Sequence, residues 1–276
     1  MSFHFSPKLV TEGLIWAMDI ANPASFTSPN GGSGNNINDL TIYNNNFTLI
    51  SSSGRPYTYN SEGLGSIDFY NDQIGSDTSG SSARLDSVIN TGDNFSVFFW
   101  VKPYSGSFAN AASASFGRNT IMTNAYVRST VPNTKCGWYF LTYAAANLPS
   151  PTVFNGFSLT IGNDDSYINT SNVLNMNNWN YIGVTVANAG ATKKAYVNGR
   201  EVNTANNVNS GPSTITYNAY LTSSIARRLD GANQPPNPVP DRFSGSLAAG
   251  HIYNRVLTPQ EVGQNYNAYK IRFGLI

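Results

Sequence analysis

Glutamates are the first candidates for chemistry in this chain, because a pair of carboxylates can hydrolyse a glycosidic bond. Retaining hydrolysis places the two carboxyl groups roughly 5–5.5 Å apart, and acids two residues apart on one strand would project to the same face. No carboxylate stands two residues away from any of the four glutamates, Glu12, Glu62, Glu201 and Glu261. The sequence therefore predicts a protein without glycosidase activity, and more broadly a protein that is not an enzyme.

Four oxygen-bearing side chains lie close together in one stretch and could bind calcium. They are Asp68, Asn71, Asp72 and Asp77. Carboxylate and amide oxygens are the ligands that calcium takes, but the same residue types are also the usual formers of turns. The turn interpretation is favoured, so we expect no cofactor, with calcium kept as the alternative.

The two histidines and the single cysteine stand apart from one another. His4 lies near the start of the chain, His251 falls in a predicted strand, and Cys136 has no second cysteine with which to form a disulfide. Their spacing matches neither a zinc site nor a nucleophile with its base. We expect His251 to pack or to hydrogen-bond within a sheet.

Charge and composition narrow the class of protein. Of the 276 residues, 11% are charged and 13% are aromatic, and the formal net charge is +1. This aromatic content argues against disorder, and the charge offers no broad basic surface to nucleic acid. No run approaches the roughly 18–20 apolar residues that span a bilayer, and residues 1–10 do not read as a secretory signal. We expect assembly in a cytoplasm, with neither nucleic acid nor membrane as a partner.

Short strands separated by turn-forming residues predict an all-β fold with one helix. Residues 95–102 form the strongest strand, which has apolar side chains on both faces, with Phe98 and Trp100 on one of them. Asn198 and Gly199 are the preferred central residues of a two-residue hairpin turn. Further strands are predicted at residues 13–19, 47–50, 66–70, 120–127, 137–143, 156–161, 179–187, 194–202 and 217–226.

Alternation also assigns side chains to faces in the first and last strands. In the first strand, Leu14, Trp16 and Met18 are expected to share a face. In the last strand, one face is expected to hold Leu247, Ala249, His251 and Tyr253.

A capped helix is predicted near residues 259–269. Thr258 and Glu261 have the spacing of a capping box, and Pro259 suits the first helical position. The positions of Val262, Tyr266 and Tyr269 give this helix one apolar side, which must dock on the β-body. We expect an N-terminal arm at residues 1–12 and one domain over residues 13–276.

Ordered stretches of the chain resemble the concanavalin A-like lectin/glucanase sandwiches, in their laminin-G-like branch. The resemblance covers GLIWAMDIANPASF, GSIDFYNDQI, FSVFFWVKP, WNYIGVTV, AYVNGREV and FSGSLAAGHIYNRVLTPQEVGQNYN, at residues 13–26, 65–74, 95–103, 179–186, 195–202 and 243–267. It implies a two-sheet antiparallel jelly-roll sandwich. Trp100, Trp179, the Asn198–Gly199 turn and the Thr258–Glu261 cap are then structural residues of that sandwich.

The Asn-rich, charge-poor form of these stretches is similar to virion proteins of tailed bacteriophages. This resemblance implies a non-enzymatic virion subunit, in capsid decoration, neck or tail fibre, present in multiple copies or as a homo-oligomer among other virion proteins. The candidate assembly contacts are Phe3 and Phe5 in the arm and Pro235 and Pro236 in the proline-rich loop at 229–241. The alternative function is a carbohydrate-binding module that attaches to a host glycan.

Overall fold

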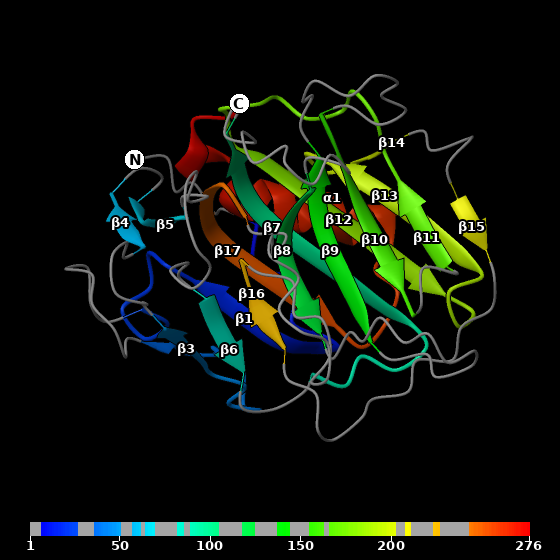
Figure 1. Cartoon of the computed structure of the whole chain (residues 1–276), viewed down its shortest axis with the longest axis horizontal. Helices are drawn as coiled ribbons and strands as arrows, with labels where there is room; N and C mark the ends of the chain where they lie inside the picture. Colours follow the sequence, from blue (N-terminus) through cyan, green and yellow to red (C-terminus); the bar gives the residue numbers. More distant parts are fainter. Residues whose placement is uncertain are drawn as a thin grey trace, which may run out of the picture.

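Two antiparallel β-sheets and one α-helix make up the described part of the chain (Figure 1). The computed structural model describes residues 7–26, 36–50, 57–61, 64–69, 82–85, 89–104, 118–124, 137–143, 155–162, 166–202, 208–210, 223–226 and 243–276. The predicted all-β sandwich of the jelly-roll type, with one short helix near the C-terminal end, is therefore confirmed.

One sheet, here called the helix-side sheet, has eight strands in the described residues, in the order β14-β13-β12-β7-β17-β5-β4, with β1 paired to β17. Its strands are β1 (Leu14–Asp19), β4 (Thr58–Asn60), β5 (Ser66–Phe69), β7 (Phe95–Pro103), β12 (Asn180–Ala187), β13 (Thr192–Val197), β14 (Arg200–Val202) and β17 (Gly245–Tyr253). The strongest predicted strand, β7, lies between β12 and β17 in the middle of this sheet.

The other sheet, here called the opposite sheet, has nine strands in the described residues, in the order β15-β11-β10-β9-β8-β16-β6-β3-β2. Its strands are β2 (Asn36–Ile37), β3 (Phe47–Ile50), β6 (Ser82–Leu85), β8 (Arg118–Asn124), β9 (Trp138–Tyr143), β10 (Gly156–Ile161), β11 (Ser166–Asn169), β15 (Val208–Ser210) and β16 (Ser224–Ile225). The sequence analysis missed β2, β4, β6, β11 and β15. They are short segments of two to four residues. A segment this short is too brief to show a clear alternation of apolar and polar residues, and it becomes a strand by pairing with a neighbouring strand.

The space between the two sheets is filled by apolar and aromatic side chains. Phe99 of β7 stacks on Phe140 of β9 at a centroid distance of 5.9 Å, and Phe95 stacks on Trp138 at 5.8 Å. These residues belong to one continuous cluster of buried side chains from both sheets. Pairs of this kind add about 0.5–1.5 kcal/mol each to the stabilisation from burial alone.

The outer face of the helix-side sheet is covered by α1 (Pro259–Tyr269) and by the 3-10 helix η2 (Lys270–Phe273). In Figure 1 the red helix lies behind the sheet that contains β7 and β12, and the strands β8, β9 and β10 lie in front. Phe98, Trp100, Val262 and Phe273 belong to a second buried cluster beneath the helix. The two faces of β7 therefore serve two different cores, as its alternation predicts.

Two predicted face assignments are wrong, and both errors have the same cause. The pairing of β17 with β7 shifts register between Leu247 and Ala249. Leu247 consequently joins the core between the sheets, whereas Ala249 and Tyr253 join the cluster under the helix. A bulge inserts one extra residue and reverses the alternation beyond it.

The same correction applies to the first strand. Its pairing with β17 is irregular between Leu14 and Trp16. Trp16 and Met18 lie in the core between the sheets, but Leu14 packs against the cluster under the helix.

Candidate functional site

The residues predicted to be structural meet around the outer face of the helix-side sheet. The ring of Trp100 stacks on Phe273 at 4.3 Å and on Tyr266 at 5.7 Å, and Trp179 contacts Phe273 at 4.6 Å. Gly199 lies so close to the helix that an added Cβ would be 3.1 Å from Tyr266 Cβ. These residues hold the helix on the sheet.

The predicted turn and cap have the expected geometry. Asn198 and Gly199 have φ values of 49° and 78°, the left-handed values that this turn requires at both positions. The Asn198 Oδ1 also accepts a hydrogen bond from the Tyr181 backbone N–H at 2.9 Å. Thr258 and Glu261 exchange the two hydrogen bonds of a capping box.

An arginine that the sequence analysis did not consider completes this cap. The Arg255 guanidinium contacts both carboxylate oxygens of Glu261, at 2.9 and 2.5 Å, and its Nε donates to the Glu12 backbone oxygen at 3.0 Å. The hydrogen bond from Arg255 is the largest influence that lowers the pKa of Glu261 to about 2. Because the guanidinium binds Glu261 tightly, this carboxylate is not available as a general acid.

His251 packs in the sheet, in agreement with its expected role. The ring is buried and lies 5.5 Å from the Tyr269 ring. Burial, followed by the nearby Arg272 guanidinium, lowers the pKa of His251 to about 3. Arg272 itself bonds to Asp19 Oδ1 at 2.6 Å and to the Gly65 backbone oxygen at 2.8 Å. His251 is therefore a neutral packing residue at neutral pH.

Several predicted positions lie outside the described residues. They include the candidate assembly contacts Phe3, Phe5, Pro235 and Pro236 and three of the four possible calcium ligands, Asn71, Asp72 and Asp77. The fourth, Asp68, is buried in β5 and accepts a hydrogen bond from Asn60 Nδ2 at 3.2 Å. Within the described ranges, no three His, Cys, Asp or Glu side chains gather closely enough to hold a metal ion. No helix in this part of the chain is both long and apolar enough to cross a membrane.

The outer face of the opposite sheet carries polar side chains that are buried. Thr120, Tyr139, Ser158 and Thr160 are all buried on the strands β8, β9 and β10. A ligand can bind only to side chains that are exposed to solvent.

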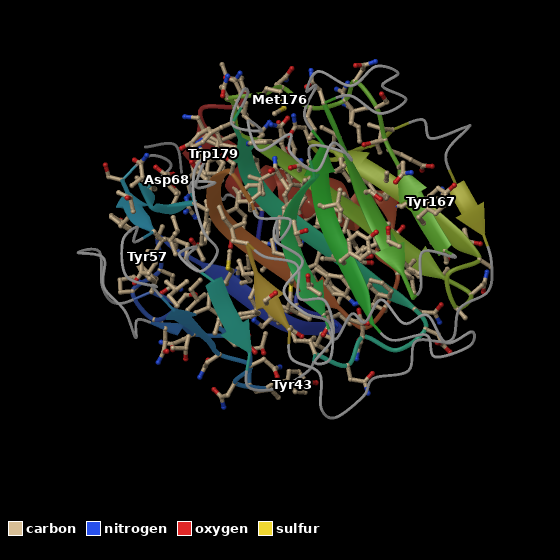
Figure 2. The ribbon with its side chains drawn as sticks, viewed as in Figure 1. Tyr43, Tyr57, Asp68, Tyr167, Met176 and Trp179 are labelled. Atoms are coloured by element: carbon tan, nitrogen blue, oxygen red, sulfur yellow. The ribbon has the colours of Figure 1, made fainter. Side chains whose placement is uncertain are left out.

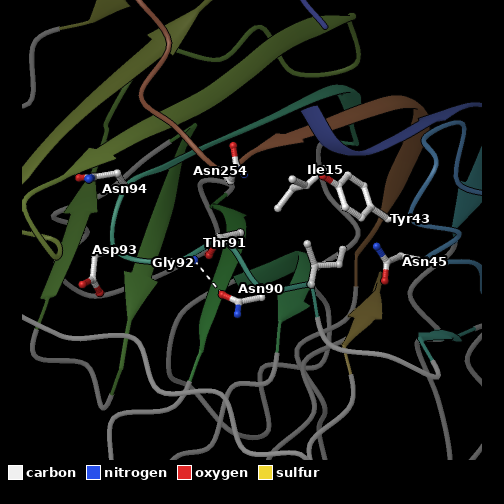
Figure 3. A pocket seen from close by; sticks show the side chains of 10 residues that line it. Ile15, Tyr43, Asn45, Asn90, Thr91, Gly92, Asp93, Asn94 and Asn254 are labelled. Carbon is white, nitrogen blue, oxygen red and sulfur yellow. Dashed lines mark hydrogen bonds between the residues drawn. The ribbon is translucent and has the colours of Figure 1, made fainter. Parts of the chain in front are cut away.

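A surface recess lies at one end of the helix-side sheet, where β1 and β7 begin and β17 ends. It is an open hollow of about 610 Å³ (Figure 3), within the range of roughly 300–1,000 Å³ that is usual for ligand sites. The described residues that line it are Ile15, Tyr43, Asn45, Ile89, Asn90, Thr91, Gly92, Asp93, Asn94 and Asn254. We call this recess the amide-lined hollow.

The loop between β2 and β3 forms one wall of the amide-lined hollow and is organised by Asp39. Its Oδ1 accepts hydrogen bonds from the backbone N–H groups of Ala17 and Thr41, at 3.1 and 2.9 Å. Its Oδ2 accepts from the Thr41 hydroxyl at 2.8 Å and from the Asn45 N–H at 3.0 Å. This buried carboxylate fixes the loop, so that Tyr43 is presented to solvent with 56% of its surface exposed.

The segment that precedes β7 forms the other wall. The Asn90 Oδ1 accepts from the Gly92 N–H at 3.1 Å, and the Asn94 Oδ1 accepts from the Asn188 N–H at 2.9 Å. Figure 3 shows Tyr43 and Asn45 on one side of the hollow and Asp93 and Asn94 on the other. The amide oxygens of Asn90 and Asn94 therefore hold the backbone of this wall in place.

The sequence analysis did not find the amide-lined hollow. The spacing of Asp39 and Thr41 is a local signal, because aspartate commonly bonds to the backbone two residues on. Such a turn carries no indication that Tyr43 lines the same hollow as Asn254. These two residues are 211 positions apart and reach one hollow because β17 ends next to the start of β1.

A family model described as the concanavalin A-like lectin/glucanases superfamily, Laminin_G_3, matches residues 77–263. This chain belongs to that family. The match covers more than half of the chain, from before β6 into α1, and leaves out β1 to β5. A search of curated protein sequences gave no match.

Solved structures with the same fold come from carbohydrate-active and toxin proteins. Domain 4 of AbnA, a GH43 extracellular arabinanase from Geobacillus stearothermophilus, solved with arabinotriose, aligns with a TM-score of 0.54 at 16% identity over 92% of this chain and 98% of that domain. The binding domain of Paraclostridial Mosquitocidal Protein 1 aligns at 0.55 and 16% identity over 93% of this chain.

A structure of botulinum neurotoxin type C, a toxin whose cell entry depends upon interaction with two ganglioside molecules, aligns with a TM-score of 0.54 at 14% identity over 93% of this chain. The chain spans about half the length of the two toxin structures, 52% and 51%. At these identities the likeness establishes the fold and not the ligand.

Proposed function

We propose that this chain is a non-enzymatic, lectin-like recognition module that binds a glycan in the amide-lined hollow. The observation that carries the proposal is the combination of an exposed Tyr43 with four asparagines in one recess. An asparagine side chain carries both hydrogen-bond donors and an acceptor, the groups that sugar hydroxyls bind. The exposed face of the tyrosine ring suits the apolar face of a sugar ring. The asparagines are Asn45, Asn90, Asn94 and Asn254.

The chemistry of the hollow favours binding over hydrolysis. Asp93 is the one carboxylate among its described lining residues, whereas glycoside hydrolysis uses two carboxylates on opposite sides of the scissile bond. Elsewhere, Glu12 and Glu261 converge on Arg255, with the nearer oxygens 4.0 and 2.5 Å from its Nη2. The hydrogen bond from the Arg255 guanidinium lowers the pKa of Glu261 to about 2, so Glu261 is ionised at neutral pH and does not supply a general acid.

The fold supports a binding role without assigning a ligand to this chain. The similar arabinanase domain was solved in complex with arabinotriose, and cell entry of the similar botulinum neurotoxin type C depends upon interaction with two ganglioside molecules. These two cases support the proposal that this chain binds a carbohydrate.

The biological setting that we propose is the surface of a tailed-bacteriophage particle. It rests on the resemblance of residues 13–26 and 252–274 to virion proteins. A recognition module displayed in many copies would bring weak individual sites together, which raises avidity. Mass spectrometry of purified particles tests the setting, and absence of the chain from them would refute it.

A glycan array tests the recognition role. We expect binding to at least one oligosaccharide, lost in Tyr43→Ala and in Asn254→Ala. The matched control is Tyr167→Ala, because Tyr167 lies on β11 at a different margin of the molecule (Figure 2). Repeating the assay with EDTA separates a metal-free site from a calcium-dependent one. Failure of every glycan to bind would refute the recognition role and favour a purely structural subunit.

A further inference from the structure

The segment that precedes β1 packs against helix α1. We call residues 8–10 the strap and residues 11–13, which join it to β1, the hinge. Of the side chains at positions 7–12, only that of Val10 is buried. It belongs to the cluster beneath the helix, together with Tyr253, Leu257 and Val262. One apolar side chain therefore anchors the strap.

The rest of the protein binds the strap through its backbone. The Asn265 Oδ1 accepts a hydrogen bond from the Val10 N–H at 2.8 Å, and the Tyr253 hydroxyl donates to the Val10 backbone oxygen at 3.0 Å. Two positions earlier, the Gln264 Nε2 donates to the Lys8 backbone oxygen at 2.6 Å. Main-chain hydrogen bonds combined with a pocket for a side chain are a recurring mode of peptide recognition. Helix α1 and the end of β17 thus form a peptide groove, which the chain fills with its own strap.

The two side chains that bind Val10 are themselves held in place. The Asn265 Nδ2 donates to the Tyr253 hydroxyl at 2.9 Å, and both side chains are buried. The hydrogen bond from the Val10 N–H is also buried. An empty groove would lose this bond and would expose apolar surface of the cluster, so the groove favours an occupant.

The hinge is short and constrained. Gly13 has a φ of 73°, and an added Cβ there would be 2.9 Å from both Asn254 Oδ1 and Arg255 Cγ. The Leu14 N–H donates to the Thr11 backbone oxygen at 3.1 Å and closes the turn. A short hinge of this kind favours the exchange of identical segments between copies, because opening the turn lets the strap reach a second groove.

From these features we propose that the groove on α1 is a self-recognition site that takes the strap of a second copy, so that two copies exchange straps and form a symmetric dimer. Because the two grooves are identical, every strap contact is kept in the exchanged pair and only the hinge changes. The balance between closed chain and dimer is then set by the hinge and by the protein concentration. This proposal concerns assembly and stands whether or not the amide-lined hollow binds a glycan.

Disulfide trapping in the full-length chain tests the exchange. All copies carry Cys136→Ser, which removes the one native cysteine. One copy carries Lys8→Cys and the other carries Gln264→Cys, at two exposed positions that face each other across the groove. The copies are mixed at high concentration in urea below the unfolding transition, which favours local opening, and are then returned to buffer and oxidised.

We expect a disulfide between the two chains. Its yield should be at least about tenfold above that of a control pair, because bound groups meet at a much higher effective concentration than free ones. In the control pair, Asn36→Cys replaces Gln264→Cys; this exposed position lies on β2 of the opposite sheet.

Two further changes assign the trapped pair to the strap. Val10→Asp in the copy that carries Lys8→Cys should abolish the disulfide between chains, because it removes the apolar anchor. Deletion of Glu12 should raise the yield, because a shorter hinge no longer lets the strap close on its own groove. Circular dichroism of each variant confirms that a loss of trapping is not a loss of fold.

A single chain with both Lys8→Cys and Gln264→Cys should close its disulfide internally at low concentration. Failure to close would refute the placement of the strap in the groove. Internal closure, with a yield between chains no higher than that of the control pair, would refute the exchange. A disulfide between chains that survives Val10→Asp would show that the copies meet through other contacts, and would refute it as well.

Discussion

Removing the cap of helix α1 by the double substitution Thr258→Ala and Glu261→Ala should destabilise the protein by about 2–3 kcal/mol at pH 7. The Thr258 hydroxyl accepts from the Glu261 N–H at 3.3 Å, and Glu261 Oε2 accepts from the Thr258 N–H at 2.8 Å. A cap of this kind contributes about 1 kcal/mol. The sequence alone predicts about 1–2 kcal/mol for the pair, and the ion pair with Arg255 adds to this value.

The pKa of Glu261 bounds the contribution of that ion pair. It lies at about 2, below the 4.5 of a free glutamate, and at roughly 1.4 kcal/mol for each pH unit the difference has a ceiling of about 3.5 kcal/mol. Solvent reaches 25% of the Glu261 side chain, so screening should reduce the effective value to about 1–2 kcal/mol.

The sign of the pH dependence follows from the direction of the shift. The folded state holds Glu261 ionised to a lower pH than the unfolded state does, so the stabilisation is complete above about 4.5 and disappears as the pH falls towards about 2. Urea unfolding of the wild type, Glu261→Gln and the double variant at pH 7, 4 and 2.5 measures this directly. The difference between wild type and Glu261→Gln should shrink with falling pH. A difference below about 0.5 kcal/mol at pH 7, or one that does not change with pH, would refute this reasoning.

Two further predictions concern the sheet beneath the helix. Gly183→Ala should destabilise the protein by about 1–3 kcal/mol or more, because the new Cβ would lie 2.0 Å from the Phe98 ring. Urea unfolding measures this loss of stability. The control is Gly263→Ala in the helix, where a new Cβ would have no neighbour nearer than 4.0 Å, and it should be neutral or stabilising. Burial lowers the pKa of His251 from 6.5 to about 3. The folded protein should therefore lose stability as the pH falls below about 6.5, because His251 takes up a proton in the unfolded state but not in the folded state. Thermal unfolding of His251→Leu between pH 7 and 5 should show a smaller acid loss than the wild type, and an identical loss would contradict the prediction.

Local chemistry explains why some features were predictable. The cap depends on residues three apart, the hairpin turn on two adjacent residues, and the alternation of β7 on a period of two. Each of these features is encoded within one short segment, so it can be predicted without knowing which strand lies beside that segment. The face assignments failed where a bulge reversed the alternation, at Leu247 and at Leu14. A bulge depends on how two strands pair, because one strand contributes an extra residue opposite its partner. The alternation within a single strand does not show where that extra residue lies.

The amide-lined hollow illustrates the same limit for function. Its walls come from four segments, around Ile15, Tyr43, Asn90 and Asn254, each of which reads as an ordinary strand end or turn. Only the pairing of β17 with both β1 and β7 brings them to one end of the sheet.

The amino-acid sequence by itself determined the all-β class, the central strand, the hairpin turn and the capped helix, because short-range hydrogen bonding and side-chain alternation are encoded residue by residue. The tertiary structure alone decided that Arg255 completes the cap, that the Asp39 loop holds Tyr43 at the surface, and that the candidate site lies at the end of the helix-side sheet. These features depend on contacts between distant segments, and such contacts exist only after the two sheets have packed and their registers are set.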